Sequence, residues 1–251
     1  MTRSSLIAFA LAACLISFIS VDTAWAARLR ISPIGLHLTA TERAGAITIV
    51  NTDERPVNLQ LRIYAWSELE DGQEQLDRTT DLIVSPPAIT VPAGASYTIR
   101  IARPVIMPVN GERAYRLLID ELPQPDDPRT VGQGIKMVLR NSLPIFITDA
   151  KAMAELKWAV WQDEAGVHAQ AQNQGKRHAK IANLMLHTAS GNPLSFGGGL
   201  NGYVLGGATR TFTAPRVAGR AGAPLRDGES VDLVAQNDAL DVKATIIVGR
   251  R

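Results

Sequence analysis

Histidine, serine and glycine-rich segments are the parts of this sequence that could take part in catalysis or bind phosphate. Ser195 is not in the Gly-x-Ser-x-Gly turn that presents the nucleophile of α/β-hydrolases. The run Gly197-Gly198-Gly199 lacks the lysine and the helix of a phosphate-binding loop. No histidine has a cysteine at the spacing of a zinc site: they are His37, His168, His178 and His187. The sequence therefore predicts no catalytic residue, no metal site and no cofactor.

Residues 135–147 have the pattern of a β-strand, which could bind another polypeptide by strand pairing. Side chains of a β-strand alternate between two faces, and here large apolar residues share one parity. Lys136, Arg140 and Pro144 have the other parity. Pro144 cannot donate a hydrogen bond within a sheet, so we expect an edge strand. The apolar set is Ile135, Met137, Leu139, Leu143, Ile145 and Ile147.

An exposed edge strand with large apolar side chains promotes aggregation, and proteins usually avoid one. Residues 123–134, just before it, are rich in proline, glycine and aspartate and predict a mobile loop. One reason to keep such an edge is to lend it to another polypeptide, which then pairs with it. From the periodicity alone, an ordinary half-buried strand is the more frequent explanation.

The first 26 residues have the three parts of a secretory signal peptide. Arg3 is positive, residues 6–21 are apolar, and Ala24-Trp25-Ala26 has the form of a cleavage site. We expect cleavage after Ala26 and export, since the span is too short for a transmembrane anchor. An alternative is that Leu11-Ala12-Ala13-Cys14 is a lipobox, which would make Cys14 a lipidated N-terminus. The apolar run continues past Cys14, which favours the signal peptide.

Charge and cysteine content limit the protein classes further. The 251 residues carry a formal net charge of +2, too weak an excess to indicate nucleic-acid binding. Cys14 is the only cysteine, so a mature chain without it has no disulfide and depends on its core. About 225 residues after cleavage suffice for one large domain or two smaller ones.

Short strands with proline and glycine turns recur along the chain, and no amphipathic helix of normal length is apparent. Their spacing is typical of immunoglobulin-like β-sandwiches. We predict an all-β fold: two tandem immunoglobulin-like β-sandwich domains, residues 27–148 and 149–251, after a signal peptide at 1–26. The expected strands before residue 148 are 29–31, 34–38, 46–50, 57–63, 82–84, 97–101, 115–119 and 135–147. Those after the link at 148–154 are 156–160, 167–171, 181–186, 200–205, 231–235 and 242–248.

Four patterns, in this order, resemble periplasmic pilus chaperones of the chaperone–usher pathway. They begin with Ser85-Pro86-Pro87 and the following Val91-Pro92-Ala93-Gly94. The stretch 115–123 resembles the strand before that family's mobile loop, and 135–147 resembles its donor strand. Gly202-Tyr203-Val204-Leu205 resembles the second domain. The lack of a disulfide and the ending Leu143-Pro144-Ile145-Phe146 resemble the archaic branch, which includes systems that make spore-coat-U-type subunits.

The resemblance implies a non-enzymatic chaperone located in the periplasm. In that family a pilus subunit is an immunoglobulin-like sandwich that lacks its last strand, and the chaperone supplies one before delivery to an outer-membrane usher. Each fully buried apolar side chain contributes roughly 1.5–3 kcal/mol, so several exceed the stability of a small domain. We also expect self-association of the free protein, no nucleic-acid partner and no stable membrane insertion. The expected groove-filling residues are Ile135, Met137, Leu139, Leu143 and Ile145.

The resemblance also implies a basic anchor for the terminal carboxylate of the subunit. Better-known members place an arginine near the start of the first strand and a lysine late on the donor strand. Here the matching positions are Gly35 and Pro144. The basic residues nearby in sequence are Arg116, Arg140 and Lys136, and arginine can bind a carboxylate with two hydrogen bonds. The alternative is that they are solvated strand charges, as most arginines are.

A second hypothesis is a secreted or lipid-anchored adhesion protein built of β-sandwich domains. In that case Trp66, Trp158 and Trp161 would contact the ligand. Tryptophan in such a pattern is more often part of a core or of a contact between domains.

Overall fold

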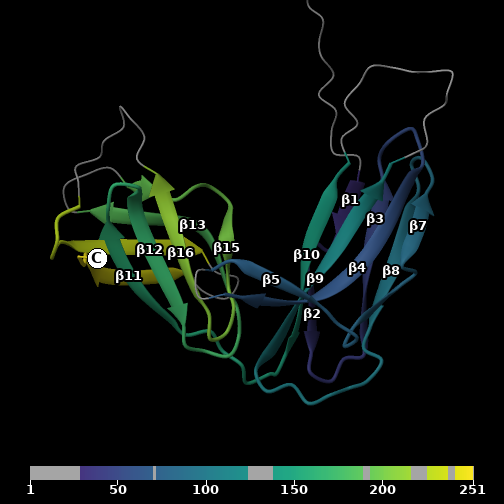
Figure 1. The fold of residues 1–251 in the computed structure, drawn as a ribbon, viewed down its shortest axis with the longest axis horizontal. Coiled ribbons are helices and arrows are strands. Elements are labelled where there is room, and N and C mark those ends of the chain that lie inside the picture. Colours follow the sequence, from purple (N-terminus) through teal and green to yellow (C-terminus); the bar gives the residue numbers. More distant parts are fainter. Residues whose placement is uncertain are drawn as a thin grey trace, which may run out of the picture.

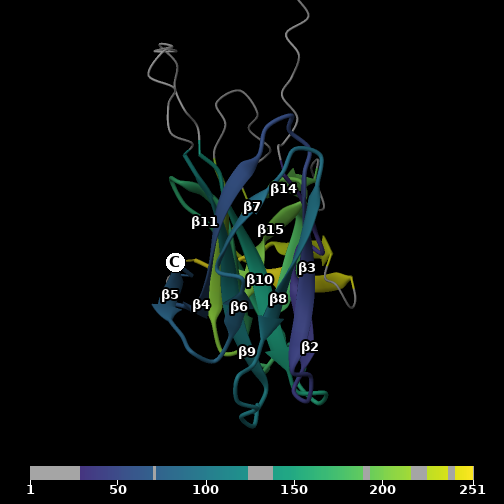
Figure 2. The same ribbon diagram turned by 90° about the vertical axis from the view of Figure 1, so that its right-hand side faces the viewer.

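The computed structural model describes residues 29–69, 72–123, 138–188, 193–215, 225–236 and 241–250. All regular elements in these ranges are β-strands, and they form two lobes that stand side by side (Figure 1). None of the described elements is a helix long and apolar enough to cross a membrane. The predicted signal peptide, most of the predicted loop and the start of the predicted donor strand lie outside the described residues. Figure 2, turned by 90°, brings the N-terminal lobe to the front.

The N-terminal lobe is a sandwich of two sheets. One has the order β1-β3-β8-β6 and the other the order β2-β10-β9-β4-β5, with β7 also paired to β4. All pairs are antiparallel except β2 with β10. The strands are β1 (Leu29–Ser32), β2 (Leu36–Thr39), β3 (Ala44–Asn51), β4 (Val57–Glu68), β5 (Glu74–Arg78), β6 (Ile83–Ser85), β7 (Ala88–Val91), β8 (Ser96–Ala102), β9 (Glu112–Leu122) and β10 (Arg140–Thr148).

The C-terminal lobe is a second, smaller sandwich. Its sheets have the orders β11-β12-β16 and β14-β13-β17-β18, with β15 also paired to β13. No strand pairing joins the two lobes within the described residues. The predicted all-β fold with two sandwich domains is therefore confirmed. The strands are β11 (Leu156–Gln162), β12 (Gly166–Asn173), β13 (Ala179–Thr188), β14 (Leu194–Ser195), β15 (Leu200–Val204), β16 (Thr209–Pro215), β17 (Ser230–Gln236) and β18 (Val242–Ile247).

Each lobe has its own core, built by the alternating strands that the sequence predicts. Leu59, Leu117 and Ile119 are fully buried between the sheets of the first lobe, and Ile181 and Leu233 occupy the same kind of position in the second. Four observed strands have no predicted counterpart: β5, β7, β14 and β16. All five residues of β5 are exposed, so this strand lacks the alternation that signals a buried face.

A buried asparagine holds the corresponding turn in each lobe. Asn51 ends β3 and Asn173 ends β12, and both are fully buried. Each side-chain amide donates to the carbonyl four residues later, that of Arg55 at 2.7 Å and that of Arg177 at 2.7 Å. Each also donates to a carbonyl on a strand of the other sheet, that of Val91 on β7 or that of Val204 on β15. Each side-chain oxygen accepts from a backbone N–H. The two turns are thus fixed by the same set of bonds.

Replacement of Asn173 by alanine should destabilise the second lobe by about 1–3 kcal/mol, because it leaves buried backbone groups without partners. Urea unfolding followed by fluorescence measures the loss. Asn58→Ala is the control, since Asn58 accepts only an exposed bond from Thr90. An equal midpoint for Asn173→Ala and wild type would show that the turn does not depend on this side chain.

Candidate functional site

The most unusual element of the first lobe is β10, one edge of which is only partly covered. On one side it pairs with β9 along its whole length, residues 140–148. On the other side β2 pairs, in parallel, with residues 145–148 alone. Residues 140–144 therefore have no strand beside them on that edge in the described part of the chain. The predicted edge strand is found over these five residues, while β2 occupies the remainder.

The side chains of β10 divide into a buried part and an exposed part. Leu143 and Ile145 face the opposite sheet and are buried in the core of their own lobe. This placement corrects the expectation that these two residues fill a groove in another protein. Just before the strand, Val138 is 53% exposed and Leu139 is 41% exposed. Ile135 and Met137 lie outside the described residues.

The uncovered edge ends at a close contact between Gly35 and Pro144. A Cβ atom at position 35 would lie 3.1 Å from Cγ and 3.3 Å from the carbonyl oxygen of Pro144. The two positions that replace the expected basic pair are thus neighbours. Because they pack this tightly, a side chain larger than glycine would crowd the start of β2.

Arg116 is the cross-strand partner of Pro144 on β9. Its guanidinium carbon lies 3.6 Å from the ring centroid of Trp66 and 5.6 Å from that of Tyr203 in the other lobe. One terminal nitrogen forms an ion pair with the Glu74 carboxylate on β5. Arg116 is only 7% exposed, and its Nε has no hydrogen-bond partner among the described residues. It is therefore a buried cation with unused hydrogen-bonding capacity.

Arg140 lies at the other end of the uncovered edge. It donates to Asp120, whose second oxygen accepts from Arg62 at 2.5 Å. Burial raises the pKa of Asp120, but the hydrogen bonds from the two arginines outweigh it and hold that pKa below its ordinary value. Arg140 is four residues before Pro144, about 13 Å along the strand. Lys136, the third predicted anchor, lies outside the described residues.

Contacts between the lobes surround the end of β10. The Glu112 carboxylate accepts from the backbone N–H of His178 at 2.8 Å and lies 2.8 Å from its Nδ1. The hydroxyl of Thr148 donates to the same carboxylate at 2.7 Å. The ring of His178 stacks on Phe146, with centroids 3.6 Å apart. These residues join the last part of β10 to the C-terminal lobe.

A second contact between the lobes involves the buried carboxylate of Glu68. It accepts from the Leu205 N–H at 2.8 Å and from Arg210 at 3.2 Å. Burial raises the pKa of Glu68 above its ordinary value. Trp66 packs nearby with Phe146 and Leu205. Sequence patterns did not single out Glu68, Glu112 or His178 for these contacts, because the contacts depend on the packing of the lobes.

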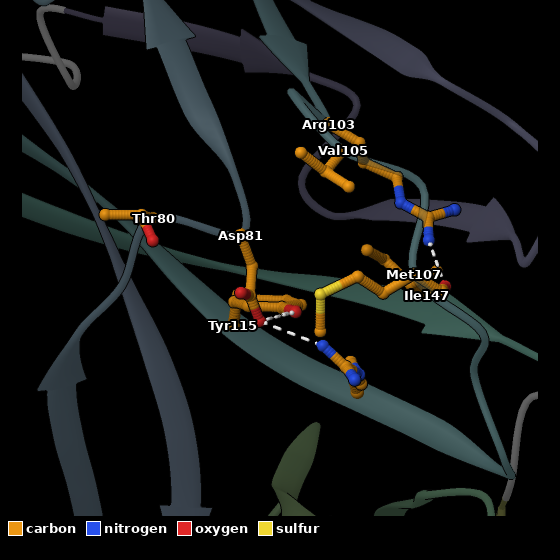
Figure 3. A pocket seen from close by; sticks show the side chains of 8 residues that line it. Thr80, Asp81, Arg103, Val105, Met107, Tyr115 and Ile147 are labelled. Carbon is orange, nitrogen blue, oxygen red and sulfur yellow. Dashed lines mark hydrogen bonds and ion pairs between the residues drawn. The ribbon is translucent and has the colours of Figure 1, made fainter.

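A small cavity of about 110 Å³ lies between the first residues of β9, the end of β10 and the loop that follows β8 (Figure 3). The hydroxyl of Tyr115 donates to Asp81 at 2.9 Å, and Arg113 donates to the same carboxylate at 3.1 Å. Burial raises the pKa of Tyr115 to about 12. Arg103 donates to the backbone carbonyls of Ala40, Glu42 and Met107. The polar side chains around the cavity thus have hydrogen-bond partners within the protein. We interpret these bonds as structural support for the loop between β8 and β9.

Comparison with known proteins places this fold among pilus chaperones. One chain of a crystal structure titled CsuC–CsuE chaperone–tip adhesion subunit pre-assembly complex, from archaic chaperone–usher Csu pili of Acinetobacter baumannii, aligns with a TM-score of 0.63 and 23% identity over 90% of this chain and 100% of that chain. The CupB2 chaperone of Pseudomonas aeruginosa aligns with a TM-score of 0.56 and 20% identity over 88% and 100% of the two chains. A chain from the Salmonella enterica SafA pilin–SafB chaperone complex aligns with a TM-score of 0.57 and 15% identity over 86% and 95%.

Sequence comparison gives the family. None of the curated proteins matches this chain. Residues 28–151 match the family described as pili and flagellar-assembly chaperone, PapD N-terminal domain. This range includes both sheets of the first lobe and the whole of β10. Through this domain the chain belongs to the pili and flagellar-assembly chaperones.

Proposed function

We propose that this protein is a periplasmic chaperone that binds, folds and caps pilus subunits by donor-strand complementation and delivers them to an outer-membrane usher. The observation that carries the proposal is the uncovered edge at residues 140–144, which Val138 and Leu139 precede with exposed apolar side chains. Family membership supports it. Two structures with this fold are titled as complexes with a tip adhesion subunit and with a pilin, which supports the partner class.

An added strand has a defined place on this edge. It pairs with the backbone of residues 140–144 and covers groups that otherwise face water. We propose that it runs parallel to β10, as β2 does on the same edge. Its last residue then meets the contact between Gly35 and Pro144. Leu139 and the apolar residues of the same parity before it enter the groove of the subunit, each contributing roughly 1.5–3 kcal/mol when fully buried.

Arg116 is the best-placed anchor for the terminal carboxylate in this arrangement. It is the cross-strand partner of Pro144, where the added strand ends, while Arg140 lies near the strand's other end. Neighbouring strands are about 4.8 Å apart, so two spacings separate β9 from a strand beside β10. An arginine that extends toward β10 can bind the carboxylate with two hydrogen bonds.

The similarity to a chain from an archaic Csu system and the single cysteine at position 14 support the archaic branch. The alternative function, a β-sandwich adhesion protein, relied on accessible tryptophans. Trp66 and Trp161 are buried, and Trp158 packs against the core of the second lobe. None of these three offers an open aromatic platform, so no observation favours the adhesion hypothesis.

Recovery of the subunit tests the proposed function directly. The tagged protein is expressed in the periplasm with genes for small signal-bearing subunits and is purified, and its partners are identified by mass spectrometry. We expect a subunit that is degraded when expressed alone and survives in a complex with this protein. If every candidate subunit is equally stable without it, the chaperone function is wrong.

Leu139→Asp should reduce the recovery of subunit by about tenfold or more, because it brings an unpaired charge into an apolar groove. The variant should fold normally, since Leu139 is exposed in the free protein. Val138→Asp is the matched control: it makes the same change at an exposed neighbour of opposite parity. Equal recovery with both variants would remove Leu139 from the donor face.

Arg116→Ala should reduce recovery by about tenfold to a hundredfold, because a carboxylate loses a charge-assisted hydrogen bond. Arg116→Lys should restore only part of the loss. Arg62 is unsuitable as the control position, because it shares the Asp120 carboxylate with Arg140, the other described candidate anchor. Arg100→Ala, at an exposed position on the other sheet, serves instead. Wild-type recovery with Arg116→Ala would show that the anchor lies elsewhere.

A further inference from the structure

Arg116 already holds a carboxylate in the free protein, that of Glu74. The strands lie in the order β10-β9-β4-β5, so a guanidinium that reaches from β9 to β5 extends away from β10. Trp66, on the strand between, lies against the guanidinium. In this conformation Arg116 is therefore on the wrong side of β9 to bind the end of a strand added beside β10.

Two aromatic rings and the Glu74 carboxylate surround the guanidinium of Arg116. Trp66 and Tyr203 lie against it, and the Arg116 side chain is almost fully buried. The Glu74 side chain is 36% exposed, on a strand whose five residues are all exposed. Rotation of the exposed Glu74 side chain can therefore break the ion pair without any change in the backbone of the sheet, which leaves the Arg116 side chain able to turn toward β10.

The charge of Glu74 is repelled by one neighbour and attracted by another. Glu74 is the cross-strand partner of Glu68, and like charges in such positions repel. Burial chiefly, and the charge of Glu74 to a lesser degree, raises the pKa of Glu68. Glu68 has its own partner in Arg210, so Arg116 is the cation that offsets the charge of Glu74. Glu74 in turn spares Arg116 the large cost of a buried charge without a partner.

We propose that Glu74 is a resting ligand of the anchor, which holds Arg116 against Trp66 until the terminal carboxylate of a subunit replaces it. This inference rests on the proposed function, since it assumes that Arg116 binds that carboxylate. The exchange trades one carboxylate for another, so the guanidinium is paired both before and after capture. A ligand without a carboxylate has nothing to offer in exchange. The contact therefore sets a threshold that favours a strand with a free C-terminus.

The first test uses acetate as the carboxylate probe and the Arg116 side chain as the reporter. The Nε–H signal of Arg116 is followed by NMR on ¹⁵N-labelled protein and is assigned by its loss in Arg116→Lys. In Glu74→Gln we expect the signal to shift at an acetate concentration about fivefold or more below that needed in wild type. Chloride at equal ionic strength corrects for screening.

Asp77→Asn is the matched control, since it removes the same charge from the opposite face of β5. Glu74 pairs across the strands with Glu68, and Asp77 pairs with Ala65, whose side chain packs against the core. We expect Asp77→Asn to respond to acetate as wild type does. An unchanged acetate midpoint in Glu74→Gln would overturn the proposal.

The second test separates this inference from the anchor itself. With the subunit that is recovered with wild-type protein, Glu74→Gln should form the complex about fivefold faster, and Asp77→Asn should match wild type. If Arg116→Ala also captures the subunit normally, the anchor is wrong and the resting contact has no role in capture. If Arg116→Ala loses capture while Glu74→Gln gains nothing, the anchor stands and Glu74 merely supports the fold.

Discussion

The pairing of β10 with β9 is the constraint on which the rest of the structure depends. It satisfies one edge of β10 and buries Leu143 and Ile145 in the core, so the strand cannot leave the sheet without losing that burial. The opposite edge is therefore presented by a strand that is held in place. A partner strand meets a preformed template, which lowers the entropy that binding must overcome. The length of that template is set by where β2 begins to pair, at Ile145.

The same two strands also connect the second lobe to the first. Glu112 starts β9 and Thr148 ends β10. The Glu112 carboxylate accepts from the Thr148 hydroxyl and contacts Nδ1 of His178 in the second lobe. Burial raises the pKa of Glu112, but the hydrogen bonds from His178 and Thr148 outweigh it and keep that pKa below its ordinary value. The carboxylate thus stays charged in the neutral range and keeps its bonds. The C-terminal lobe consequently brings Tyr203 to Arg116, although none of its strands pairs with β10 in the described part of the chain.

Alternation predicted most of the strands but missed β5, β7, β14 and β16. It also could not say which core an apolar side chain enters. Leu139 and Leu143 have the same parity, yet one is exposed and the other is buried. The difference depends on whether the opposite sheet reaches that level of the strand, which is a property of the tertiary structure. The resemblance alone matched Gly35 and Pro144 to the positions of the family's basic pair, and the structure puts these two residues in contact. Glu74 had no signal at all, because β5 is exposed at every position and only its register with β4 brings that carboxylate to Arg116.

The position of the anchor determines what else the site requires. A Cβ atom at position 35 would already crowd Pro144, so in our proposal the cation comes instead from β9, one strand further inside the sheet. In the unbound state, water can hydrate a cation at an exposed sheet edge, but it cannot fully hydrate an arginine that is buried against Trp66. It needs a partner in the unbound state, and the hairpin of β4 and β5 supplies one. The same hairpin also reaches the second lobe, where a Cβ atom at Gly72 would lie 3.2 Å from Cγ of Arg210. A relative with basic residues at the positions of Gly35 and Pro144 has no need of a carboxylate at the position of Glu74.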